Sequence, residues 1–240
     1  MSVVAGVTPK EADRTMSLKT WWALPMIQPL SRHLVVLVIN RTSLTANHVT
    51  AMAIVLRLVT FFCFLLASRS LLVVGAVSYF FAYVCDCADG TIARMKNESS
   101  ELGRYLDHVS DLVGDICILG ALSWSQNLFM EPWVWAMAFM HIAECYMSYL
   151  AGFVIDGHEG GLNDFALFRR FNHYRQWFFA KNLKSFFSFP DYTALVFVFC
   201  PLLGVPALGL SVGFYFLLTI VLYTVLATFV TIHTDEVLFP

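Results

Sequence analysis

Residues 71–88 read LLVVGAVSYFFAYVCDCA, and residues 102–124 read LGRYLDHVSDLVGDICILGALSW. Both stretches are mostly apolar and lack the alternation of apolar and polar residues that is typical of a membrane β-barrel strand. A helix needs about 20 predominantly apolar residues to cross the hydrocarbon layer of a membrane. The two stretches therefore predict a pair of membrane-spanning helices, joined by a polar connection and carrying aspartates close to that connection.

The composition of the whole chain also indicates a membrane protein. Of the 240 residues, 58% are hydrophobic and 13% are charged, and the mean hydropathy is +0.68. Soluble domains have about 45–50% apolar and about 25% charged residues, so this chain has too few polar groups to cover a globule. The formal net charge of −2 gives no reason to expect a nucleic-acid partner. The six cysteines lie in apolar stretches, which suits buried thiols rather than a secreted disulfide scaffold.

Six stretches are long and apolar enough, or nearly so, to cross a membrane. The expected fold is an all-α integral membrane protein, with a six-transmembrane-helix bundle in residues 48–240. An interfacial amphipathic helix is expected in residues 17–47, and a polar tail in residues 1–16; a seventh span over Trp21–Ile39 is the alternative, which two prolines and an arginine disfavour. The six expected spans are His48–Ser68, Leu71–Ala88, Leu102–Trp124, Trp133–Ile155, Tyr192–Leu208 and Leu210–Ile232.

The distribution of lysine and arginine predicts the orientation of these spans. With the N-terminus inside, every one of the 15 basic residues except Arg57 and Arg69 falls in an inner segment. Cytoplasmic loops of membrane proteins carry the excess of basic residues. Both termini are therefore expected in the cytoplasm, together with the polar connection between the second and third spans.

Four aspartates lie where the second span ends and the third begins. Asp86 and Asp89 are three residues apart, and Asp107 and Asp111 are four apart, so each pair is expected on one face of its helix. Ionisable groups inside a span are costly and functional by default. Carboxylates gathered around one cavity favour hard divalent cations, Mg²⁺ or Mn²⁺. Two such ions would stabilise both the attacking and the leaving oxygen of a phosphoryl transfer.

Three further residues near the aspartates suit a phosphate ligand. Gly90 permits close backbone approach, and Arg94 offers a guanidinium fork for an anion. Gly103 lies near the start of the third span, where backbone N–H groups favour a phosphate.

The string Asp-x2-Asp-Gly-x2-Ala-Arg-x8-Gly-x3-Asp-x3-Asp resembles the signature of the CDP-alcohol phosphotransferase family. The resemblance implies a six-span membrane enzyme, commonly a homodimer, that cleaves a CDP-linked substrate at its pyrophosphate and releases CMP in phospholipid biosynthesis. The eight matching positions are Asp86, Asp89, Gly90, Ala93, Arg94, Gly103, Asp107 and Asp111.

The resemblance also implies roles for individual residues. The four aspartates would bind two Mg²⁺ ions, and Asp111 would in addition take the proton from the acceptor hydroxyl. Asn47 lies in Leu44-Thr45-Ala46-Asn47, where family members often have Leu-Thr-Pro-Asn, and Ser100 lies six residues after Arg94; both are candidates for nucleotide contact, with a helix N-cap as the other interpretation of Ser100. The residues expected to hold the nucleotide are Asn47, Gly90, Ala93, Arg94, Ser100 and Gly103.

Two substrate arrangements are compatible with this motif. The stretch Asn97–Gly103, followed by Asp107-His108, is similar to ethanolamine and choline phosphotransferases. That similarity favours a CDP-linked head group, or its phosphonate analogue, as donor and a diacylglycerol-type lipid as acceptor. The alternative is CDP-diacylglycerol as donor, with glycerol phosphate or inositol phosphate as acceptor. It would use the basic cluster of the loop Asp156–Pro190, which can also be read as positive-inside anchoring: Arg169, Arg170, Arg175, Lys181 and Lys184.

Other polar residues lie inside the expected spans. Arg57 should face a polar cavity, either as a phosphate contact or as the partner of Asp115, Glu144 or another buried acid. His141 and Glu144 should face the bundle interior as hydrogen-bonding residues, with amine binding as an alternative for Glu144.

A divalent-cation transporter is the competing function, because intramembrane aspartates also line ion pathways. The motif aspartates lie near one end of their spans, with no matching acidic set at the other end, and inverted repeats are not visible. These features favour the enzyme.

Overall fold

The computed structural model describes residues 6–16, 20–98, 101–156, 177 and 188–233. Within these ranges the regular structure is helical and contains no β-strand, which confirms the expected all-α class. In chain order the elements are α1 (Pro9–Thr15), α2 (Ala23–Arg41), α3 (Ala46–Leu66), α4 (Arg69–Lys96), α5 (Glu101–Ser125), α6 (Pro132–Asp156), α8 (Phe189–Ala194), the π-helical η1 (Leu195–Phe199), α9 (Cys200–Leu203) and α10 (Pro206–His233).

Several of these helices are suited to a membrane, which supports a multi-pass protein. Among the described residues, four helices are long and apolar enough to cross: α2, α3, α4 and residues Pro206–Phe229 of α10. Helices occur at all six expected positions, but the run Phe189–Leu203 is a shorter apolar helix. The expected number of six spans is therefore not confirmed.

The structure extends α4 beyond the expected span. The apolar stretch predicts a span that ends at Ala88, whereas α4 continues as one helix to Lys96. The side chain of Ser68 caps its start, and Asn97 ends it in the left-handed conformation with φ of 54°. Apolar residues mark only the part of a helix that is embedded, while the backbone hydrogen bonds continue through the polar part. Both aspartates of α4, with Gly90 and Arg94, are consequently held on a regular helix.

The break before the last helix lies earlier than the sequence indicated. Gly204, with φ of +75°, terminates α9, and Pro206 opens α10. A left-handed glycine after a helix followed closely by a proline is a common helix stop. The guanidinium of Arg69 packs over Gly204, and its Nη2 donates to the carbonyl of Leu202 at 3.3 Å. The fifth helical run thus ends at Leu203 rather than Leu208.

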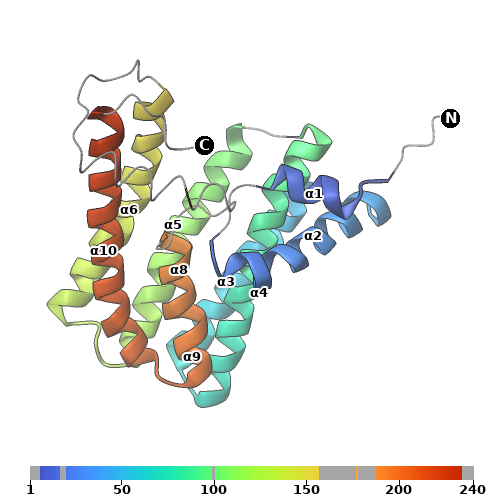
Figure 1. The fold of residues 1–240 in the computed structure, drawn as a ribbon. Coiled ribbons are helices and arrows are strands. Elements are labelled where there is room, and N and C mark those ends of the chain that lie inside the picture. The colour runs from blue at the N-terminus through green and yellow to red at the C-terminus, as the bar shows by residue number, and fades with distance from the viewer. Residues whose placement is uncertain (1–5, 17–19, 99–100, 157–176, 178–187, 234–240) are drawn as a thin grey trace.

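The first long helix, α2, is continuous through Pro29. It packs against α4, and in Figure 1 it runs transverse to the long axis of α4. Its buried residues recur as a stripe at Ala23, Ile27, Ser31, Val35 and Val38. Since α2 is also one of the candidate spans, its interfacial position is not confirmed.

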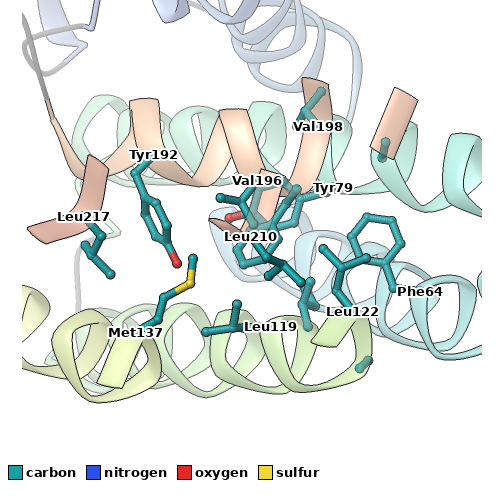
Figure 2. Close-up of a cluster of buried hydrophobic side chains, with 14 of the residues drawn as sticks. Phe64, Tyr79, Leu119, Leu122, Met137, Tyr192, Val196, Val198, Leu210 and Leu217 are labelled. Carbon is teal, nitrogen blue, oxygen red and sulfur yellow. The ribbon is translucent and has the colours of Figure 1, made fainter. Parts of the chain in front are cut away.

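The bundle is organised around two sets of helix contacts. The helix α3 packs against both α4 and α5, while α10 packs against α6 and against the run α8–η1–α9. Between them lies a core whose buried side chains, including Phe64, Leu122, Tyr192 and Leu210, point toward one another (Figure 2). The helices α3 and α4 approach closely at Gly75, where an added Cβ would lie 2.6 Å from the ring of Phe64. This packing places the polar ends of α3, α4 and α5 beside one another.

Candidate functional site

Three of the four motif aspartates meet at one point. Carboxylate oxygens of Asp86 on α4 and of Asp107 and Asp111 on α5 all lie within 4.8 Å of one another. The two helices come together here because both pack against α3. The spacing of four residues between Asp107 and Asp111 turns both side chains toward Asp86, as the helical period predicts.

The fourth aspartate, Asp89, is not part of this group. It is 5% exposed, and its Oδ2 accepts a hydrogen bond of 2.6 Å from Oγ1 of Thr50 on α3. The hydrogen bond from Thr50 draws the Asp89 carboxylate toward α3, although Asp86 and Asp89 lie on the same side of α4. Three of the four carboxylates thus meet within 4.8 Å, and Asp89 lies outside that set. Thr50 was missed because no local pattern links two positions 39 residues apart.

Arg57 lies against the aspartate group from the side of α3. It is 7% exposed, and its Nη1 lies 2.6 Å from Oδ1 of Asp111. Its Nη2 lies 3.7 Å from Oδ1 of Asp86. These contacts fit the expected role of Arg57 as a partner of acids, and its role as a phosphate contact stays a prediction.

A second set of polar groups lies deeper in the helix bundle, beyond Arg57 and the aspartate group. Asp115, one turn further along α5, accepts hydrogen bonds from the hydroxyl of Tyr79 at 3.1 and 3.0 Å. Nε of Arg57 lies 3.9 Å from Oδ1 of Asp115, a charge contact too long for a hydrogen bond. Nε2 of His141 lies 4.0 Å from Oδ2 of the same carboxylate. No sequence pattern points to Tyr79; only the need of a buried acid for a hydrogen-bond donor could have indicated it.

Gly114 makes room for this arrangement. A Cβ at this position would lie 3.0 Å from Cδ of Arg57, tighter than most real contacts. The absence of a side chain therefore lets α5 approach the stem of the arginine. Gly114 was not recognised from the sequence, because a glycine inside an apolar helix has many structural uses.

The buried residues of α6 have structural partners. His141 is fully buried, with Nδ1 at 3.5 Å from the hydroxyl of Tyr192. Glu144 is 2% exposed, and its Oε1 accepts hydrogen bonds from Ser148 at 3.0 Å and from Thr224 of α10 at 2.6 Å. Both residues face the interior and join hydrogen bonds, as expected.

The expected nucleotide-binding residues that the structure describes gather at one end of the bundle. Gly90, Ala93 and Arg94 occupy the last two turns of α4, and Nη2 of Arg94 donates to Thr91 at 3.4 Å. Gly103 is the third residue of α5, and Asn47 is exposed in the first turn of α3. Nζ of Lys96 donates to the carbonyl of Leu44 at 2.6 Å, which holds the end of α4 beside the start of α3.

Some sequence candidates lie outside the described residues. These are Ser100, Arg169, Arg170, Arg175, Lys181 and Lys184. All six cysteines are described and free. As expected, Cys63, Cys85 and Cys200 are buried, but Cys87 and Cys145 are half-buried and Cys117 is exposed.

The donor set of the aspartate group fits a hard divalent cation. It offers three carboxylates from two rigid helices, with no sulfur or nitrogen ligand in the group. Mg²⁺ and Mn²⁺ prefer such oxygen ligands. The side chain of Asp111 remains 38% exposed, so the group is open on one side to a ligand.

Comparisons with known proteins agree with the site. The sequence model of the family described as CDP-alcohol phosphatidyltransferase matches residues 43–231, well over half of the chain. CDP-diacylglycerol–inositol 3-phosphatidyltransferase 1 of Arabidopsis thaliana is 35% identical over 79 residues, which are 32% of this chain and 35% of that protein. The probable CDP-diacylglycerol–inositol 3-phosphatidyltransferase 2 of the same plant is 47% identical over 45 residues, which are 19% of this chain and 20% of that protein. The chain thus spans about a third of the length of the first relative and a fifth of the second.

Proposed function

Because the chain belongs to the CDP-alcohol phosphatidyltransferase family, we propose that it transfers a substituted phosphate from a CDP-linked donor to an alcohol and releases CMP. The observation that carries the proposal is the meeting of Asp86, Asp107 and Asp111 within 4.8 Å, since all three are positions of the motif. A divalent-cation transporter receives no support from the family match. We place the reaction in phospholipid biosynthesis, at the cytoplasmic side of a membrane.

The metal is proposed as Mg²⁺, with Mn²⁺ as a substitute, held at a two-ion site by Asp86, Asp107 and Asp111 together with Asp89. When bound, the ions would neutralise charge on the pyrophosphate and on the leaving CMP. Thr50 on α3 holds the side chain of Asp89 in place by the hydrogen bond of 2.6 Å. The proposed ligands are therefore the three converging carboxylates and Asp89, a fourth carboxylate on α4 that α3 orients.

Asp111 is proposed as the base because it is a partly exposed member of the group. It takes the proton from the acceptor hydroxyl, whose oxygen forms a bond to the β-phosphorus of the donor. The bond between that phosphorus and the bridging oxygen breaks, and its electron pair leaves with CMP. Holding both reactants in line supplies much of the rate acceleration in such a transfer.

The cytidine diphosphate is assigned to the end of the bundle where α3, α4 and α5 meet. Gly90, Ala93 and Arg94 lie there on α4, near Gly103 and the exposed Asn47. Ser100 is included on the family motif alone.

For the substrates, we propose CDP-diacylglycerol as donor and a polar alcohol, inositol or a polyol phosphate, as acceptor. The names of both Arabidopsis relatives support this choice over the head-group donor that the sequence first favoured. The second candidate, a CDP-linked head group with a diacylglycerol-type acceptor, keeps the support of Asn97–Gly103 and Asp107-His108. For a phosphorylated acceptor, we propose that Arg169, Arg170 and Arg175 bind its phosphate.

The assembly is proposed as a homodimer in the membrane, with residues 1–16 as a tail, 17–47 as a juxtamembrane segment and 48–240 as the catalytic domain. The family match, residues 43–231, covers most of the proposed catalytic domain.

The test of the proposed base is Asp111→Asn in purified protein, with CMP release as the readout. General base catalysis contributes roughly 10²–10⁴-fold, so turnover should fall by at least about a hundredfold while nucleotide binding is partly retained. Ser110→Ala is the matched control, because Ser110 Oγ donates only to the carbonyl of Asp107 at 3.0 Å among its described contacts. Turnover of Asp111→Asn equal to that of Ser110→Ala would refute the assignment.

A further inference from the structure

Arg57 is a buried cation that contacts the metal-ligand candidates but is no part of the motif. It comes from α3, whereas the carboxylates come from α4 and α5. Its guanidinium makes ion-pair contacts with Asp111 at 2.6 Å and with Asp86 at 3.7 Å. Two of the three carboxylates in the group therefore already face a fixed positive charge.

Arg57 also contacts a carboxylate on its inner side, deeper in the helix bundle. Its Nε faces Asp115 at 3.9 Å, and Asp115 is in turn fixed by both hydrogen bonds from Tyr79. Asp115 is 5% exposed. Gly114 leaves space for the arginine stem, because a Cβ at this position would lie 3.0 Å from Cδ of Arg57. The guanidinium is thus fixed between Asp115 on its inner side and the aspartate group on its outer side.

We propose that Arg57 is a built-in counter-cation that stabilises the aspartate group in the absence of metal and sets its affinity for Mg²⁺. Three carboxylates within 4.8 Å repel one another, and the guanidinium offsets this repulsion. The same charge disfavours a divalent cation nearby, and its Nη1 engages Oδ1 of Asp111, an oxygen that an ion could bind. Arg57 is therefore a positioning residue, and Asp115 and Tyr79 act through it. The inference rests on the metal site of the proposed function.

The test compares Asp115→Asn with the double variant Arg57→Met/Asp115→Asn. Removing Arg57 alone would leave Asp115 buried without its cation, which is strongly destabilising. In the Asp115→Asn background this cost is absent, and the asparagine can still accept from Tyr79. The two proteins then differ only at position 57, where one carries the guanidinium and the other does not. Binding of Mg²⁺ alone is measured by calorimetric titration, and melting temperatures are measured in EDTA and in Mg²⁺.

The double variant should bind Mg²⁺ at least about tenfold more tightly than Asp115→Asn, since a nearby positive charge has been removed. Its melting temperature in EDTA should be lower than that of Asp115→Asn, and Mg²⁺ should raise its melting temperature by more. Arg69→Met is the matched control: Arg69 lies at the start of α4 and contacts Leu202, so its loss should lower the melting temperature equally in both conditions. If the double variant does not fold, Arg57→Gln/Asp115→Asn, which keeps a polar side chain at position 57, should show the same tightening of Mg²⁺ binding.

Equal Mg²⁺ affinity in the two variants, or equal losses of melting temperature with and without Mg²⁺, would overturn the inference. If wild-type protein still releases CMP in that case, only the role of Arg57 fails. Absence of Mg²⁺ binding by the wild type would overturn both this inference and the proposed metal site.

Discussion

Thr50 provides a sharp test of the site because its hydroxyl fixes the carboxylate of Asp89, a proposed metal ligand. Its hydroxyl donates a bond of 2.6 Å to a carboxylate that is 5% exposed. A hydrogen bond to a charged group contributes about 1.5–3 kcal/mol, and valine has nearly the shape of threonine without the donor. We therefore expect Thr50→Val to lower the free energy of unfolding by about 2 kcal/mol.

The same change should alter the metal requirement. Loss of a group that orients a metal ligand typically costs about 10–100-fold in metal affinity. If Asp89 is a ligand, the Mg²⁺ concentration that gives half-maximal CMP release should rise by that factor. Both effects are measured on purified protein in lipid nanodiscs or detergent, by Mg²⁺ titration of activity and by reversible denaturation in EDTA.

Two controls separate these effects. Thr50→Ser keeps the hydroxyl and should behave as wild type. Thr60, further along α3, donates to the backbone carbonyls of Leu56 on α3 and Gly75 on α4. Thr60→Val should cost about 1 kcal/mol in stability without changing the Mg²⁺ requirement. A Thr50→Val protein with wild-type stability and wild-type Mg²⁺ requirement would refute the reasoning.

Two further predictions concern the support of the site. Tyr79→Phe removes both described hydrogen bonds to the buried Asp115, so the free energy of unfolding should fall by about 1–3 kcal/mol; a change below about 0.5 kcal/mol in a denaturant titration would contradict this. Gly75→Ala places a Cβ 2.6 Å from the fully buried ring of Phe64 and should cost about 1–3 kcal/mol through overpacking. Gly120→Ala is its control, because the nearest atom to the added Cβ would lie at 3.8 Å. This control should be neutral or stabilising by up to about 1 kcal/mol. Equal melting temperatures for the two variants would disprove the close approach of α3 and α4.

The helices were predictable where a single physical signal governs them. Apolar length located helices at all the expected positions, because burial in lipid demands it. The same signal placed the end of α4 eight residues early, since the helix continues through the polar motif to Lys96. It also ran past Gly204, whose positive φ ends α9 although the flanking residues are apolar.

The site was predictable to the extent that it follows from helical periodicity. The periodicity brought Asp107 and Asp111 to one face, and the structure adds Asp86 to them. The partners from α3, Thr50 and Arg57, depend on how three helices pack, and side-chain spacing along one helix carries no such information. The sequence is accordingly compatible with several acids as partners of Arg57, and the packing of the helices brings it to Asp111, Asp86 and Asp115.

Metal-dependent release of CMP from a CDP-linked donor is the most direct test of the proposed function. Purified protein in lipid nanodiscs is supplied with CDP-diacylglycerol and inositol or a polyol phosphate, or with CDP-ethanolamine and diacylglycerol. Each pair is tested with Mg²⁺ and with EDTA. The account predicts CMP from CDP-diacylglycerol only when Mg²⁺ and a polar alcohol are both present. CMP from the CDP-ethanolamine pair alone would reverse donor and acceptor, and absence of Mg²⁺-dependent CMP from every pair would contradict the proposed function itself.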